Sequence, residues 1–213
     1  MEQYYFPPIA LEGGKWSVGV VDFHSYNSVP NIDESNNLIK IGPHEIQIPT
    51  GAYEVEEIND YLSSELKRLD PNHTISIQGN SNTLKTEVKS SLPVYVSTLG
   101  SLLGFQSKKF LAANILHMSD SPIQINKVTD VRIECNIAQG NYINNQKCNS
   151  IFGFDINVPP GYKLSLSPQT VIYYPIVVES IDCLLVQIVD QAGNLLNFRS
   201  EDIVIRLHLK KSP

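Results

Sequence analysis

The sequence predicts an all-β protein: an eight-stranded single jelly-roll sandwich that carries a small α/β insertion. Two observations predict this fold. Short segments of alternating apolar and polar residues recur from residue 123 onward, and turn residues separate them. The strongest helical pattern is confined to a segment between residues 38 and 105. An immunoglobulin-like sandwich is the competing all-β fold.

Composition excludes several classes of protein. The chain has 213 residues, of which 42% are hydrophobic and 18% charged, so it can build an apolar core. Its net charge of −6 argues against direct binding to nucleic acid, since proteins that coat nucleic acid usually carry a basic balance. The longest apolar runs, such as 181–189, are far shorter than the roughly 20 residues of a membrane-spanning helix.

The first residues and the cysteines indicate where the protein is made. The N-terminal MEQYYFPPIALEGG has neither the basic nor the apolar region of a secretory signal, so we expect no export through a signal peptide. The three cysteines, Cys135, Cys148 and Cys183, are widely spaced and form no Cys-x-x-Cys pair. Free thiols in a reducing compartment are therefore expected, and no metal site is predicted.

Residues 1–14 are predicted to form an N-terminal arm that ends at a Gly13-Gly14 hinge. The aromatic and proline residues of this segment show neither a helix period nor a strand period. Exposed aromatic side chains are costly unless something covers them, so we interpret the arm as a segment that docks on a neighbouring subunit. A frayed terminus is the alternative. The predicted assembly contacts are Tyr4, Tyr5, Phe6, Pro7 and Pro8.

The predicted jelly-roll domain comprises residues 15–37 and 115–213. Its first strand begins near Trp16, where apolar residues switch from one face to the other, which indicates a bulge or burial on both sides. The last strand has the cleanest alternation of apolar and polar residues. The eight predicted strands are 15–25, 123–126, 131–137, 151–156, 162–166, 171–174, 176–189 and 203–209.

The predicted insertion, residues 38–114, mixes strands with one helix. Two short strands flank Gly42-Pro43, and a hairpin turns at residues 79–82. Between them, apolar residues recur every three or four positions from Val55 to Leu69, with acidic residues early and basic residues late, as an amphipathic helix requires. The insertion could form an outward tower or a lateral contact, and the sequence leaves both open.

No catalytic motif is evident. The chain has no G-x-S-x-G elbow, glycine-rich phosphate loop, H-E-x-x-H or calcium loop. Asp22 and His24 lie two residues apart on a predicted strand and could share a face, but no nucleophile or third orienting group is evident. We therefore expect a protein that is not an enzyme and holds no cofactor.

Several long segments together suggest a family. In chain order they are GGKWSVGVVDFHSYNSVPNI, IQIPTGAYEVEEINDYL, NTLKTEVKSS, GSLLGF, VRIECNIAQGNYIN, VPPGYK and VDQAGNLLNFRSEDIVIRLHLK. Over nearly the whole chain they resemble the minor capsid, or penton, proteins of animal Polinton (Maverick) elements and the related adintoviruses. The resemblance leads us to expect glycine at position 200, where this chain has serine. Ser200 therefore suggests that the turn here does not need a positive φ.

The resemblance implies a structural role. A penton protein of this family is a single jelly roll that forms pentamers at the fivefold vertices of an icosahedral capsid. The implied partners are further copies of the chain and the major capsid protein of the same element, and the implied location is the virion. The resemblance supplies no catalytic residues.

A second function class remains open. A receptor- or glycan-binding jelly roll, such as a spike or lectin-like module, would use aromatic side chains on loops at the edge of the sandwich. Tyr142 and Tyr162 lie near asparagine-rich turns and are the candidates for such a site.

Overall fold

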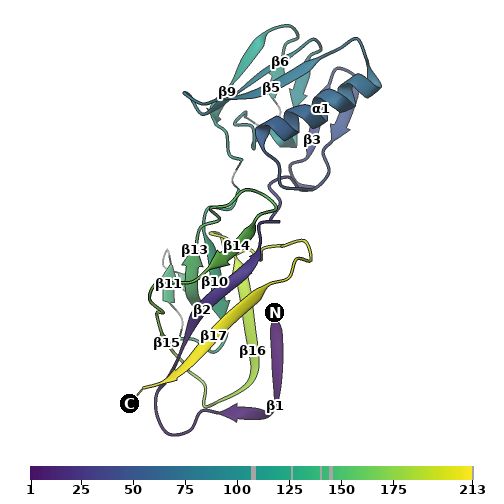
Figure 1. Cartoon of the computed structure of the whole chain (residues 1–213). Helices are drawn as coiled ribbons and strands as arrows, with labels where there is room; N and C mark the ends of the chain where they lie inside the picture. The colour runs from purple at the N-terminus through teal and green to yellow at the C-terminus, as the bar shows by residue number, and fades with distance from the viewer. Residues whose placement is uncertain (107–108, 126, 140, 144–145, 213) are drawn as a thin grey trace. The chain divides into compact units, whose positions relative to one another are not determined.

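The computed structural model describes residues 1–106, 109–125, 127–139, 141–143 and 146–212. The chain divides into two compact units (Figure 1). The body comprises Met1–Ser28 and Val128–Pro213, and the insertion comprises Val29–Lys127. The insertion is longer at both ends than the predicted range 38–114. One reason is the antiparallel bridge between Ile32 and Gly51, which joins the residues before the first predicted strand to this unit.

Two four-stranded antiparallel sheets form most of the body and give the eight strands of the predicted jelly-roll-like fold. In the first sheet the strand order is β1, β16, β10, β13. In the second, β2 is the central strand and pairs with all three others. Strand β17 pairs along most of its length, β14 near its end and β15 near its start. The strands are β1 (Glu2–Ala10), β2 (Trp16–Tyr26), β10 (Val131–Cys135), β13 (Ser150–Phe154), β14 (Lys163–Leu166), β15 (Tyr174–Pro175), β16 (Ser180–Val189) and β17 (Val204–Lys211).

Apolar residues from both sheets fill the body. Val18 and Phe23 of β2 and Ile133 of β10 are fully buried, and the Phe23 ring lies 4.9 Å from the ring of Phe154 on β13. The predicted irregularity of the first strand is confirmed, because the pairing of β2 with β17 skips Val21. A bulge there turns the strand so that residues on both of its faces are buried.

The eight strands are not all the predicted ones. The predicted strand 123–126 is wrong: β9 ends at Pro122, and Ile123 packs against the core of the insertion instead. Asn126 lies outside the described residues. The eighth strand is β1, in a segment that showed no strand period. An edge strand needs only one hydrogen-bonded neighbour and tolerates proline, so it can form without an alternating apolar pattern.

The described residues of the insertion form two antiparallel sheets and one α-helix, α1 (Val55–Leu69). The predicted helix is confirmed at both ends. The Glu54 backbone N–H donates to Glu57 Oε2 over 2.8 Å at its start, and Lys67 and Arg68 lie in its last turn. The sheets contain β4 (His44–Gln47), β3 (Leu38–Ile41), β7 (Val94–Val96) and β8 (Lys109–Leu111), in that order, and β5 (Ile75–Asn80), β6 (Lys85–Ser90) and β9 (Leu116–Pro122).

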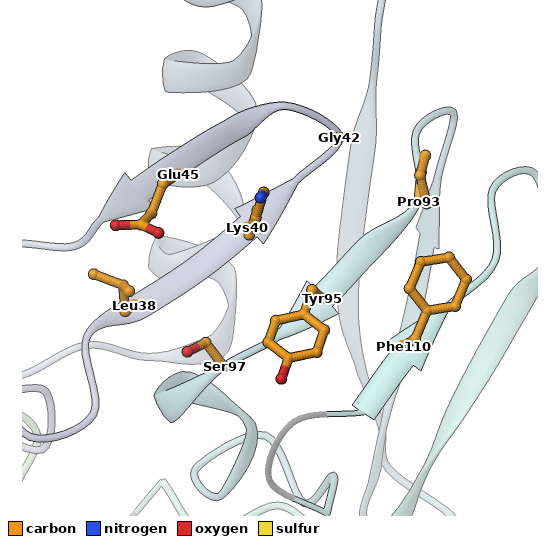
Figure 2. Close-up of a pocket in the computed structure, with 8 residues that line it drawn as sticks. All are labelled: Leu38, Lys40, Gly42, Glu45, Pro93, Tyr95, Ser97 and Phe110. Atoms are coloured by element: carbon orange, nitrogen blue, oxygen red, sulfur yellow. The ribbon is translucent and has the colours of Figure 1, made fainter.

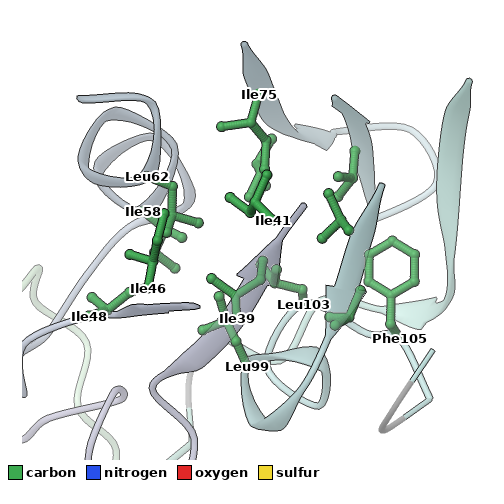
Figure 3. Packing of buried hydrophobic residues seen from close by; sticks show 14 of the residues in the cluster. Ile39, Ile41, Ile46, Ile48, Ile58, Leu62, Ile75, Leu99, Leu103 and Phe105 are labelled. Carbon is green, nitrogen blue, oxygen red and sulfur yellow. The ribbon is translucent and has the colours of Figure 1, made fainter. Parts of the chain in front are cut away.

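A single apolar cluster holds the insertion together. Ile58, Leu62 and Leu66 form the buried stripe of α1, and Figure 3 shows the first two facing Ile46 of β4. Further buried side chains come from both sheets and from the short 3-10 helix Thr98–Gly100. The insertion therefore has its own core.

Three smaller features complete the fold. A ribbon of β11 (Asn141–Ile143) and β12 (Gln146–Cys148) belongs to the body, and all three cysteines are free. The expectation for Ser200 is wrong, since Arg199 and Ser200 have φ of 53° and 65° and form the left-handed turn without glycine. Within the described residues, no helix has the length and apolar content needed to cross a membrane.

Candidate assembly surface

Most side chains of the arm are exposed. Phe6 is 99% exposed and Tyr4 67%, Pro7 and Pro8 are exposed, and Tyr5 is partly buried. All five predicted contact residues thus lie on β1, where the ring of Phe6 is fully exposed, that of Tyr4 is mostly exposed and that of Tyr5 is partly covered. An isolated exposed aromatic ring is ordinary, but several on one edge strand are typical of an interaction surface.

Strand β1 pairs with β16 at both of its ends, but the middle of the strand bulges out of the pairing. Tyr4 is paired with Cys183 and Ile9 with Ile181, so residues 5–8 face only Asp182 on β16. Pro7 and Pro8 have no N–H to donate to the sheet, which accounts for the bulge. Beyond the strand, the Leu11 N–H donates to the Glu179 carbonyl over 3.0 Å. Figure 1 shows the resulting bend of β1 beside β16.

The hydroxyl of Tyr4 is held in its neutral form. It donates a 2.6 Å hydrogen bond to Glu2 Oε1. This bond and the negative charge of Glu2 raise the pKa of Tyr4 to about 12. Like any tyrosine, Tyr4 is uncharged near neutral pH, and its ring can be covered without the cost of burying a phenolate.

The predicted hinge has the backbone that glycine favours. Gly13 and Gly14 have φ of +65° and +147°, and a Cβ on Gly14 would lie 3.1 Å from Cε of Lys211. Side chains other than hydrogen would strain this turn. The arm is therefore joined to β2 by a turn that only glycine fits easily.

A groove lies next to this hinge, with a volume of about 480 Å³. Apolar side chains supply most of its lining, and Val177 at its rim is 64% exposed. The sequence alone does not reveal the groove, because three separate segments form it and residues 176–178 belong to a predicted strand, 176–189, that in the structure begins only at Ser180. The lining residues are Leu11, Gly14, Lys15, Trp16, Gln139, Pro175, Ile176, Val177, Val178 and Glu179.

Asp22 and His24 do share a face, and Ser165 lies opposite His24 in the register of β14 and β2. Ser165 Oγ is 2.9 Å from His24 Nδ1, while His24 Nε2 is 3.6 Å from Asp22 Oδ1. The order of nitrogens is opposite to that of a serine-hydrolase triad, in which the acid orients Nδ1. The buried Asp22 carboxylate is instead paired with Arg206 on β17. This row links three strands and lines neither the groove nor the hollow described below for the insertion.

Tyr142 and Tyr162, the candidates for a glycan site, are 75% and 65% exposed. Tyr142 lies on β11 and Tyr162 immediately precedes β14. Neither residue lines the groove or the hollow of the insertion. No cluster of three metal-ligating side chains occurs in the part of the chain that the structure describes.

Comparison with solved structures shows a full-length similarity of fold. The chain is similar to the mavirus penton protein, known from a crystal structure, with a TM-score of 0.54 at 10% sequence identity. The match covers 100% of this chain and 91% of the mavirus protein. No family model matches the chain, and no curated protein matches it. The chain therefore has a penton-like fold, with a sequence far from that of the mavirus protein.

Proposed function

We propose that this protein is a penton, or minor capsid, subunit of a Polinton- or adintovirus-like element. It forms homopentamers at the fivefold vertices of an icosahedral shell, contacts the major capsid protein of the same element and resides in the virion. The observation that carries the proposal is the similarity of fold to the mavirus penton protein over 100% of the chain, insertion included. The sequence motifs, which occur in the same order along the chain, support the assignment to Polinton- or adintovirus-like elements.

Ring formation requires two different patches on each subunit, because a rotational contact is heterologous. The arm and the groove are two such patches. We propose that Phe6 and its neighbours on β1 cover apolar surface on the adjacent subunit, with the groove beside Trp16 as the receiving surface. Burial of one phenylalanine side chain contributes about 1.5–3 kcal/mol, and a ring repeats the contact at every interface.

In this proposal the protein acts through fit alone. The body supplies the lateral contacts of the ring, and no bond is made or broken. The Asp22–His24–Ser165 row then has a structural task, which is to connect β2 with β14 and β17. Ser165→Ala is accordingly expected to leave assembly unchanged.

The number of subunits tests the proposal. Light scattering and negative-stain microscopy of the purified full chain should show fivefold rings, alone or after addition of the major capsid protein. A strict monomer at every salt concentration, even with the major capsid protein present, would overturn the proposal. A trimer would do so as well, because it would indicate a spike or a component of the main shell.

A further inference from the structure

One row of side chains crosses the outer face of the four-stranded sheet in the insertion. Glu45 of β4 is paired with Lys40 of β3, Lys40 with Tyr95 of β7, and Tyr95 with Phe110 of β8. We call these four residues the aromatic row. Figure 2 shows the rings of Tyr95 and Phe110 on adjacent strands, with Lys40 and Glu45 on the strands beyond Tyr95.

The aromatic row lines a hollow of about 550 Å³. Alternate residues of the same strands, such as Ile39, Ile41 and Val94, point the other way and are buried in the core. The row is thus fixed in place by the packing behind it. The remaining lining residues are Leu38, Gly42, Pro93 and Ser97.

The rings in this hollow are open to solvent. Tyr95 is 36% exposed and Phe110 is 64% exposed. The solvent face of an antiparallel sheet is normally polar, so two adjacent aromatic rings on it need a reason. Flat rings at the floor of a concave surface are typical of small-molecule sites.

The polar groups around the rings are available for a ligand. Within the described residues, the side chains of Lys40, Glu45, Tyr95 and Ser97 make no hydrogen bond or ion pair. The ammonium group only donates, the carboxylate only accepts, and the two hydroxyls do both. One positive and one negative charge lie next to each other on the Tyr95 side of the two rings, so the hollow has no net charge to attract an ion.

We propose that this hollow binds a neutral saccharide. The C–H face of a sugar ring would lie on Tyr95 and Phe110, and its hydroxyls would accept from Lys40 and donate to Glu45. A phosphate or sulfate would meet the Glu45 carboxylate, and a cation would meet Lys40, whereas a polyol satisfies both groups. The volume falls within the roughly 300–1,000 Å³ of ligand pockets. This activity goes beyond the proposed capsid role, which does not require it.

Saturation-transfer NMR of the full chain tests the proposal. The probes are glucose, galactose, N-acetylglucosamine and their neutral oligomers, with a sialylated and a sulfated oligosaccharide for comparison. We expect binding of at least one neutral probe. Loss of either ring, in Tyr95→Ala or Phe110→Ala, should weaken that binding about tenfold, as expected for the loss of one aromatic contact.

Matched controls distinguish saccharide binding at this hollow from binding elsewhere on the chain and from an effect on assembly. Tyr162→Ala and Tyr142→Ala remove exposed tyrosines of the body and should leave saccharide binding unchanged. The Tyr95 and Phe110 variants should keep the thermal unfolding midpoint and the subunit number of the parent, so that failure here is distinct from failure of the penton proposal. Three results would overturn the inference: no neutral probe binds, only the acidic probes bind, or binding survives in both ring variants.

Discussion

Lys127 Nζ lies 2.7 Å from Oδ2 of Asp33, so the last residue of the insertion is tied to one of its first. A second link runs beside it, because Asn31 Nδ2 donates to the Ile125 carbonyl over 3.0 Å. The two chain segments that enter and leave the insertion are thus joined by side chains as well as by its sheets. A compact unit inserted in a loop gains from such a closure, since its ends are held together.

This closure should weaken in acid. Burial raises the pKa of Asp33, but hydrogen bonds from Lys127 and Ser35 more than offset it and lower the pKa from 3.8 to about 2. A carboxylate with a lowered folded-state pKa stabilises the fold above its ordinary pKa, and this stability is lost as pH falls from about 4 to about 2. We expect Asp33→Asn to lower the free energy of unfolding by about 1 kcal/mol at neutral pH, a figure reduced for solvent screening. The stability of this variant should fall little further in acid.

Hydrogen exchange of the α1 amides, measured between neutral pH and pH 2, checks this expectation. Glu34→Gln is the matched control, because it removes the same charge from the adjacent exposed residue. If the two variants respond to pH alike, the Asp33–Lys127 pair does not stabilise the insertion.

The core of the insertion predicts a large contrast within one helix. Leu62 is fully buried on α1, whereas Leu69 at the end of the same helix is 40% exposed. We expect Leu62→Ala to destabilise the insertion by about 2–5 kcal/mol and Leu69→Ala by less than about 1 kcal/mol. Urea unfolding followed by the helical circular-dichroism signal measures both. Equal losses would mean that α1 does not pack on the sheets as described.

Sequence patterns predicted the helix and strands that have one face buried and the other exposed. Helix α1 has its apolar residues at helical spacing because one stripe faces the core, and β17 alternates because one face of it is covered. Strand β1 left no such pattern, since nearly all its side chains are exposed and its place depends on backbone pairing with β16. Its role as a contact segment was predicted from its aromatic residues and remains a prediction.

The sites that depend on register could not be predicted. Tyr95 and Phe110 are far from Lys40 in the sequence, and only the pairing of β3, β7 and β8 places them in one row. Ser165 likewise becomes a neighbour of His24 only through the register of β14. The alternation of apolar residues fixes the face on which each of these side chains lies, but which strands pair, and in which register, depends on segments far apart in the sequence.

The buried carboxylate of Asp22 gives a prediction for the body. The Asp22 side chain is 8% exposed, and Arg206 on β17 is its partner. In Arg206→Leu the carboxylate stays buried without its cation, which should cost about 2 kcal/mol. Lys163→Leu, which removes an exposed cation from β14 in the same sheet, is the control and should change stability by less than about 0.5 kcal/mol. Thermal unfolding followed by the fluorescence of Trp16, which lies on β2, compares them; similar shifts would contradict the role given to the pair.

The arm gives the last prediction. Phe6 is 99% exposed, so its removal takes no contact from the folded monomer and Phe6→Ser should leave the unfolding midpoint unchanged. If the neighbouring subunit covers Phe6 at each interface of the pentamer, the same variant should weaken the affinity of each subunit contact at least tenfold, because the apolar burial of a phenylalanine is lost. Analytical ultracentrifugation over a range of protein concentrations measures this shift. Tyr162→Ser, an exposed aromatic outside the arm, is the control. Unchanged assembly in Phe6→Ser would exclude the bulge of β1 from the interface, whatever the subunit number.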